Sequence, residues 1–382
     1  MAYDTVIVGS GIAGLSAAYR LAPDHDVLIV DRAGIGEGTS SRASGVMTAP
    51  VDYPDQPEWT AHTTDFFRDL DDTGTFAWTD RNYVRGVRPE DHDRAEASAA
   101  TDGVELVDVG AYDDVFSDDA PYDRALVWDD CGYCDVDDLL ATLHSEARSR
   151  GVEFRPDTSV TSVRVTDGVA TGVETEYGSV EADTVVMAAG SATRDLLADT
   201  LELPIRKFTW NVAYLDANLD REFPMGGDPH YGVYWRGTDD GHLLVGLEHR
   251  YESEPPHDGE DVFGDRLDTF LSEDLQTLLA AVEDHTNVVR YEVCPMADAT
   301  TPDAKGIIDA PKEGPDDLVV AAGFHGAGVM ATGSIGTAVR SLVTGENAPF
   351  DLDPFALDRF DTRGTDFEFA SLFGAGNWST NV

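Results

Sequence analysis

A glycine-rich turn, GSGIAG at residues 9–14, constrains this chain more than any other feature of its sequence. A continuous apolar run at 5–8 precedes the turn, and apolar residues then recur at helical spacing from Ile12 to Ala22. A second apolar run at 27–30 ends in Asp31. This order of strand, glycine-rich turn, helix and strand predicts a βαβ unit that binds a dinucleotide.

Each glycine of the turn has a distinct physical task. Gly9 allows the tight turn, Gly11 lets a pyrophosphate approach the backbone, and Gly14 lets the helix pack closely on the strand. The helix N-terminus offers free N–H groups and a partial positive charge, while Asp31 can accept hydrogen bonds from a ribose hydroxyl. These features disfavour a 2′-phosphorylated cofactor but do not separate FAD from NAD. The predicted nucleotide-binding residues of this unit are Gly9, Ser10, Gly11, Ile12, Ala13, Gly14, Asp31 and Arg32.

The charge of the chain is extreme, with 73 Asp and Glu against 26 Lys and Arg and a net charge of -47 over 382 residues. That length predicts two or three domains. A carboxylate-rich, lysine-poor composition resembles haloarchaeal usage, because molar salt shortens the Debye length to about 3 Å and screens the self-repulsion. An acidic protein of a dilute cytoplasm is the alternative. Nucleic acid is excluded as a partner, since a phosphate backbone would be repelled.

The chain contains no run of 18 apolar residues, and its N-terminus enters a strand pattern directly. We therefore expect a soluble, cytoplasmic protein without a membrane span. Cys131 and Cys134 form a lone CxxC pair with Cys294 far away, which matches neither a disulfide framework nor a zinc site, and we expect no metal.

The rest of the chain alternates helical and strand patterns without a repeat or a long linker. Residues 135–150 predict an amphipathic helix, and 89–124 predict a helix with surface loops. Two runs that end in Ala-Ala-Gly, at 185–190 and 319–328, predict buried parallel strands. The other predicted elements are an antiparallel meander at 152–154, 160–165 and 169–175, strands at 207–215, 231–236 and 242–247, and helices at about 261–285 and 329–344.

Several motifs in order resemble the D-amino-acid oxidase and sarcosine oxidase superfamily of FAD-dependent oxidoreductases. After the glycine-rich turn come GEGTSSRASGVM at 36–47, CGYCDVDDL at 131–139, VVMAAGSATRDL at 185–196, TPDAKGIID at 301–309 and LVVAAGFHGAGVMATGSIG at 318–336. The resemblance implies an α/β fold: a Rossmann-like FAD-binding domain of discontinuous segments and a β-rich, antiparallel substrate domain. We expect the FAD-binding domain at 1–75, 132–205 and 290–350, the substrate domain at 76–131 and 206–289, and a C-terminal tail at 351–382.

The resemblance also implies which residues contact FAD. The segment 38–46 would wrap the pyrophosphate and flavin, Val160 would meet the adenine, and the helix after the C-terminal glycines would face the flavin. A plain Ser/Gly surface loop and a core strand residue are the alternatives for the first two. The residues carried over are Thr39, Ser40, Ser44, Gly45, Val160, Ala189, Gly190, Gly323, His325, Gly326, Gly328 and Val329.

In this family the substrate amine or alcohol carbon loses a hydride to flavin N5, and the protein orients the substrate. An arginine or lysine that holds a substrate carboxylate usually does so with tyrosines of the second domain. The candidates here are Tyr231, Tyr234, Arg236 and Arg42, with His325 as a further donor, although each is equally readable as a structural side chain. The resemblance thus implies oxidation of a C–N bond in an amino acid or secondary amine.

This chain departs from the family at informative positions. Met330 and Gly45 stand where sarcosine oxidases show a lysine and an arginine that bind the carboxylate. The resemblance places Leu244 where those oxidases have the lysine that helps oxygen react, which favours a dehydrogenase with another electron acceptor. Cys294 lies near the family's site of covalent flavin attachment, with a small buried cysteine as the alternative. A 2-hydroxy acid dehydrogenase and a non-catalytic electron-relay subunit remain alternative functions.

Overall fold

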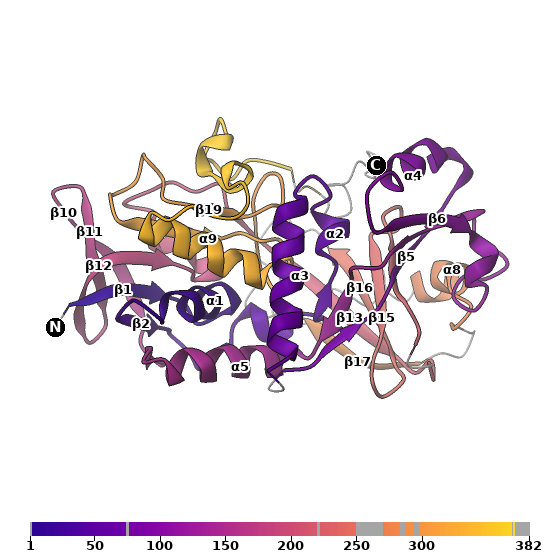
Figure 1. Cartoon of the computed structure of the whole chain (residues 1–382), viewed down its shortest axis with the longest axis horizontal. Helices are drawn as coiled ribbons and strands as arrows, with labels where there is room; N and C mark the ends of the chain where they lie inside the picture. Colours follow the sequence, from indigo (N-terminus) through magenta and orange to yellow (C-terminus); the bar gives the residue numbers. More distant parts are fainter. Residues whose placement is uncertain are drawn as a thin grey trace.

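The computed structural model describes residues 2–73, 76–219, 222–249, 270–282, 287–293, 298–368 and 370. It contains two large sheets side by side, one mostly parallel and one mostly antiparallel (Figure 1). This arrangement confirms the predicted fold class. Cys294 and residues 261–269 and 283–285 of the predicted helix lie outside the described residues, and within the rest a π-helical segment (Phe270–Leu275) precedes the short helix α8 (Gln276–Leu278).

The first sheet has a parallel core in the order β9-β2-β1-β12-β20. These strands are β1 (Tyr3–Val8), β2 (Val27–Val30), β9 (Glu153–Arg155), β12 (Gly178–Met187) and β20 (Leu318–Ala322). The short strand β19 (Ile307–Asp309) pairs antiparallel with β20. Strands β10 (Val160–Thr166) and β11 (Val169–Thr175) form the predicted meander with the start of β12.

Side-chain alternation along the parallel strands divides the core in two. Ile7 and Ile29 face a cluster built with helices α1 (Ile12–Leu21), α5 (Val136–Ser149), α9 (Thr332–Thr344) and α3 (Pro57–Asp71). Val6, Val8 and Leu28 face the opposite cluster, under the meander. Because both faces of these strands are buried, their sequences are unbroken apolar runs.

Helix α9 starts at Thr332, three residues later than the predicted start at 329. The preceding loop contains three positions with left-handed backbone, which a helix cannot include. Gly323, His325 and Gly326 have φ values of 85°, 52° and 80°. The glycine-rich run therefore forms turns that bring the chain back over the sheet, and the helix follows them.

The second sheet runs in the order β17-β13-β16-β15-β14-β5-β7-β6, and all its neighbours are antiparallel except β14 and β5. Its strands are β5 (Tyr83–Val87), β6 (Val104–Asp108), β7 (Arg124–Trp128), β13 (Arg206–Leu215), β14 (Met225–Asp228), β15 (Val233–Gly237), β16 (Leu243–His249) and β17 (Val288–Val293). Strands β17 and β18 (Asp298–Thr300) both pair with β13, so hydrogen bonds of the second sheet extend past residue 290.

The interpretation of 89–124 as a helix with surface loops was incomplete. Helix α4 (His92–Ser98) is present, but β6 follows it and pairs with β7. The sequence of β6, VELVD, is short and partly exposed at the end of the sheet, so its apolar pattern is weak.

Shorter elements connect the two sheets. Strands β3 (Val46–Met47), β4 (Trp78–Asp80) and β8 (Gly132–Cys134) form a small third sheet. Helices α2 (Ala49–Asp52), α6 (Thr193–Leu196) and α8 (Gln276–Leu278) are single turns. Helix α2 follows β3 closely in the chain and lies between the two large sheets (Figure 1).

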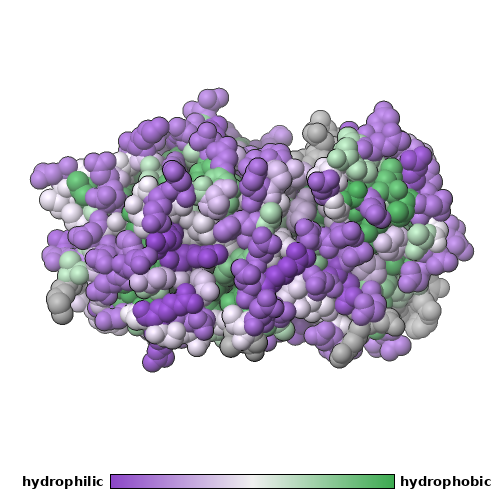
Figure 2. Space-filling model, in the orientation of Figure 1, coloured by the Kyte–Doolittle hydropathy of each residue, from purple (hydrophilic) through white to green (hydrophobic). Residues whose placement is uncertain are grey.

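Hydrophilic side chains cover most of the face shown in Figure 2, in line with the net charge of -47. Among the residues with described coordinates, no helix combines the length and apolarity needed to cross a bilayer.

Candidate active site

A cavity of about 400 Å³ opens where the parallel strands meet the second sheet. The residues at the carboxyl ends of four parallel strands line one side of it, namely Val8, Val30, Ala188 and Ala322. Residues of β5, β13, β14 and β15 line the other side. Ligands of doubly wound α/β folds bind at this edge of the sheet, and the volume suits a small-molecule site.

The glycine-rich turn forms a backbone cradle with no room for side chains. Gly9 has a φ of 106°, and a Cβ there would lie 2.4 Å from the carbonyl oxygen of Ala188. A Cβ on Gly14 would lie 1.9 Å from the carbonyl oxygen of Gly9. These contacts agree with the turn and packing tasks that the sequence analysis gave to the two glycines.

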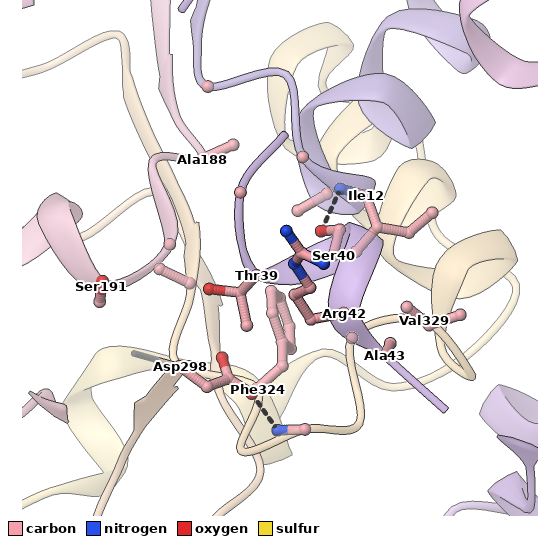
Figure 3. Close-up of a pocket in the computed structure, with 18 of the residues that line it drawn as sticks. Ile12, Thr39, Ser40, Arg42, Ala43, Ala188, Ser191, Asp298, Phe324 and Val329 are labelled. Atoms are coloured by element: carbon pink, nitrogen blue, oxygen red, sulfur yellow. Dashed lines mark hydrogen bonds between the residues drawn. The ribbon is translucent and has the colours of Figure 1, made fainter. Parts of the chain in front are cut away.

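The loop at 38–44 closes over the N-terminus of α1. The Ser40 hydroxyl oxygen accepts a hydrogen bond from the Ile12 N–H at 2.9 Å, and Thr39 and Arg42 project beside it into the cavity (Figure 3). Arg42 forms no ion pair within 4.0 Å with any carboxylate of the described part of the chain. The guanidinium is therefore available to an anionic ligand in the cavity.

Asp31 is oriented from three directions. Its Oδ2 accepts hydrogen bonds from the Ser10 N–H at 2.6 Å and the Ser10 hydroxyl at 2.7 Å, and its Oδ1 accepts one from the Ala33 N–H at 2.9 Å. Ser10 itself is fully buried and does not line the cavity, so it supports Asp31 from behind. The carboxylate faces the cavity at the end of β2, where a ribose hydroxyl would meet it.

The C-terminal glycine loop lies on the opposite side of the cavity, as Figure 3 shows. Asp298 accepts hydrogen bonds from the backbone N–H groups of Ala299 at 2.7 Å and Gly326 at 2.6 Å. Burial raises the pKa of the Asp298 carboxyl above its usual range. Asp298 was not found by sequence reasoning, because its only local signal is its distance of five residues from the TPD motif.

Most of the predicted cofactor residues do line this cavity. They are Gly9, Gly11, Ile12, Ala13, Asp31, Arg32, Thr39, Ser40, Ser44, Val160, Ala189, Gly190, Gly323, Gly326, Gly328 and Val329. Gly14 and Gly45 lie behind the lining, and a Cβ on Gly45 would meet the carbonyl oxygen of Cys134 at 2.2 Å.

The predicted substrate-contacting residues separate into two groups. Arg42 and Tyr234 line the cavity, whereas Tyr231, Arg236 and His325 do not. The Arg236 Nε donates to the carbonyl oxygen of Ser44 at 2.8 Å and therefore braces the 38–44 loop from outside.

His325 and Tyr231 are directed into packed regions. The His325 ring stacks on Phe208 with centroids 4.3 Å apart, and its Nδ1 lies 2.6 Å from the Thr300 hydroxyl. Tyr231 packs against Phe270 and lies beneath the guanidinium of Arg88. Leu244 is completely buried in β16 and does not line the cavity either.

The end of the cavity at the second sheet holds residues that sequence reasoning missed. Asp52 ends helix α2, Tyr83 starts β5 and Met225 starts β14, and all three line the cavity with Tyr234 and Met330. Burial raises the pKa of Asp52 to about 6 and those of Tyr83 and Tyr234 to about 12. These residues come from three segments far apart in the chain, so no local sequence pattern predicts that they share a site.

These features together define a dinucleotide-binding α/β protein whose nucleotide cavity continues to the second sheet. The site fits FAD, because the cradle excludes side chains at the predicted pyrophosphate position and Asp31 and Arg42 offer an acceptor and a cation. Over residues 4–342 the sequence matches the family described as FAD dependent oxidoreductase, DAO. The chain belongs to this family, and its cofactor is FAD.

Curated relatives carry amine and amino acid oxidase names. The chain is 26% identical to 4-methylaminobutanoate oxidase (formaldehyde-forming) of Paenarthrobacter nicotinovorans over 93% of this chain and 45% of the relative. It is 28% identical to human peroxisomal sarcosine oxidase over 59% of this chain and 60% of the relative. Glycine oxidase of Pseudomonas putida is 29% identical over 68% and 75%. The chain thus spans only about half of the first two relatives.

Solved structures share the fold at low sequence identity. L-proline dehydrogenase from P. horikoshii superposes with a TM-score of 0.82 at 18% identity, covering 94% of this chain and 98% of that one. Glycine oxidase from Geobacillus kaustophilus gives a TM-score of 0.76 at 20% identity, covering 94% and 99%.

Proposed function

We propose that this protein oxidises a C–N bond in an amino acid or secondary amine and passes the electrons to an acceptor other than oxygen. The observation that carries the proposal is the continuous cavity, whose lining runs from the nucleotide cradle to Tyr83, Met225 and Tyr234 of the second sheet. The relatives named for 4-methylaminobutanoate, sarcosine and glycine support the amine class. FAD, when bound, supplies the acceptor for the electron pair of the substrate.

The chain's own residues hold the cofactor and enclose the substrate. Asp31 accepts from the ribose, the α1 N-terminus and Arg42 face the anionic part of the nucleotide, and Ser40 ties the 38–44 loop to α1. Arg236 positions that loop through Ser44. We propose no general base, because bound FAD accepts the electrons and the protein has only to orient the substrate.

The preference for a dehydrogenase rests on the apolar side chain of Leu244 and its complete burial. A lysine is absent from the described lining of the cavity, so a cation of that kind does not assist oxygen there. We propose an unidentified acceptor, which distinguishes this protein from its relatives with oxidase names. Two alternative functions are tested against this proposal, namely that of a 2-hydroxy acid dehydrogenase and that of an electron-relay subunit.

The test is an anaerobic titration of the purified flavoprotein in molar KCl. We expect one or more N-methylated amines or amino acids to bleach the flavin absorbance near 450 nm, and a dye to reoxidise it faster than air does. Bleaching by 2-hydroxy acids alone would move the assignment to that class. A flavin that no compound of the three classes bleaches would leave only the electron-relay function.

We also propose that the protein works in the cytoplasm at molar salt. Its net charge of -47 and its three lysines support this setting, because dense carboxylates repel one another unless salt screens them. Activity and the unfolding midpoint should both rise as KCl is increased from dilute buffer to molar concentration. A midpoint that falls over this range would refute the halophilic assignment.

A further inference from the structure

At the end of the cavity near the second sheet, the described lining includes one charged side chain, the carboxylate of Asp52. Five charged residues line the described cavity: Asp31, Arg32, Arg42, Asp52 and Asp298. The first three belong to the βαβ unit and the 38–44 loop, and Asp298 is held by two backbone N–H groups of the C-terminal loops. Asp52 belongs to none of these segments, because it ends helix α2, which lies between β3 and β5 in the chain.

The carboxylate of Asp52 is fixed but not neutralised. Its Oδ2 accepts a hydrogen bond from the Thr48 hydroxyl at 2.6 Å, one turn back on α2. Within the part of the chain that the structure describes, no second donor reaches Asp52, and no cation pairs with it within 4.0 Å. Arg85 influences it only through its charge. One carboxylate oxygen is therefore available to a ligand in the cavity.

The surroundings of Asp52 suit a cation with an apolar body. Met330 lies 3.9 Å from the Thr48 hydroxyl through its sulfur, and Met225 lines the same end. Tyr83 and Tyr234 add aromatic faces, and aromatic rings attract ammonium groups. A carboxylate ligand would meet like charge from Asp52, and the one cation whose charge acts on Asp52, buried Arg85, does not line the cavity.

We propose that Asp52 is a specificity-determining residue, which selects a substrate that presents a positively charged primary or secondary ammonium group at this end of the cavity and rejects one that presents a carboxylate there. The inference rests on the proposed function and narrows it from amino acids and amines to organic ammonium compounds. Thr48 acts as a positioning residue, because its hydroxyl holds the Asp52 carboxylate toward the cavity.

The test measures ligand binding rather than turnover. N-methylbenzylammonium and phenylacetate share a ring and are similar in size but opposite in charge. Each is titrated into the FAD-loaded protein at one fixed KCl concentration, by calorimetry and by the flavin difference spectrum. We expect the wild type to bind the ammonium probe at least about tenfold more tightly, the effect of one charge-assisted hydrogen bond.

Two variants separate Asp52 from general charge effects. Asp52→Asn should lose about tenfold or more in affinity for the ammonium probe and gain affinity for phenylacetate. Asp69→Asn removes one negative charge from the exposed face of α3 and should change neither affinity. Equal loss in both variants, or none in Asp52→Asn, would overturn the inference.

The wild type alone provides a second test if Asp52→Asn fails to fold. Affinity for the ammonium probe should fall as the pH drops below about 6, where Asp52 becomes neutral. The groups that face Asp52 are Thr48, Tyr53, Tyr83, Arg85 and Cys131. None changes charge near that pH, because burial raises the pKa of Tyr83 to about 12 and also raises the pKa values of Tyr53 and the Cys131 thiol. Tighter binding of phenylacetate by the wild type at pH 8 would refute the inference outright.

Failure of the proposed function gives a different result. Tight, Asp52-dependent ammonium binding without bleaching by any amine would remove the enzymatic function but support the specificity of the site. Bleaching by carboxylate-bearing amino acids, with affinity unchanged in Asp52→Asn, would keep the function and remove the inference.

Discussion

Asp52 should destabilise the folded protein at neutral pH, and the amount follows from its environment. Burial raises its pKa from 3.8 to about 6. The folded state therefore binds this proton more tightly than the unfolded state does. The stability that the group contributes is present at low pH and is lost as the pH rises from the unfolded to the folded pKa. A shift of about two units corresponds to about 3 kcal/mol.

The substitution Asp52→Asn removes this titration while keeping an acceptor for Thr48. We expect the free energy of unfolding of the variant, relative to the wild type, to increase by about 3 kcal/mol between about pH 4 and about pH 7.5. Comparing the two proteins at each pH cancels the other 72 acidic residues to first order. Because the charged form of Asp52 lowers the stability of the fold and lies in a cavity, we infer a binding role for it.

The assay is urea unfolding followed by tryptophan fluorescence, at a fixed KCl concentration and equal FAD content. Asp69→Asn serves as the control, because its exposed carboxylate should give a difference from the wild type that does not depend on pH. A pH-independent difference for Asp52→Asn would refute the reasoning, since Asp52 would then titrate alike in the folded and unfolded chains.

Three further predictions concern the cofactor site and the C-terminal segment. Gly14→Ala should abolish FAD retention, measured by absorbance after gel filtration, because its Cβ would lie 1.9 Å from the Gly9 carbonyl oxygen. Ser40→Ala should weaken FAD binding, measured by fluorescence titration, with a cost of about 1 kcal/mol for the lost helix cap. Asp303→Asn should lower the urea midpoint near pH 7 by breaking the two-point ion pair with Arg359, whose N–O distances are 2.8 and 2.9 Å. Arg359 lowers the pKa of Asp303, so this loss should disappear as the pH falls below that pKa.

Matched controls make each of these outcomes decisive. Gly364→Ala meets no atom within 4 Å and should retain FAD. Ser41→Ala changes a neighbouring hydroxyl that bonds within its own loop, so an equal loss of FAD affinity would show that Ser40 has no special role. Arg359→Ala should lower the midpoint further than Asp303→Asn, because Arg359 also donates to the carbonyl oxygens of Ala356 and Gly306, and fully additive losses in the double variant would contradict the ion pair.

Local sequence was sufficient to predict those structural features that residues close together in the chain form among themselves. The turn at 9–14 needs its glycines because of contacts within one βαβ unit, so spacing alone revealed Gly9, Gly14 and Asp31. The strand segments at 5–8 and 185–187 are buried on both faces, and burial leaves a continuous apolar run. Weakly buried β6 lacks that signature, and it was missed for this reason.

Tertiary structure decided which side chains share the far end of the cavity. Asp52, Tyr83 and Met225 come from three separate segments and meet only because β5 pairs with β14 and α2 follows the loop over the nucleotide site. Arg236 and His325, which the sequence left open between a functional and a structural role, are directed away from the cavity, into a hydrogen bond with Ser44 and a stack on Phe208. The sequence by itself thus determined the dinucleotide cradle, because its chemistry is local, while the choice of FAD came from the ordered motifs along the chain. The substrate end was decided by strand pairing, since its chemistry depends on residues that only folding brings together.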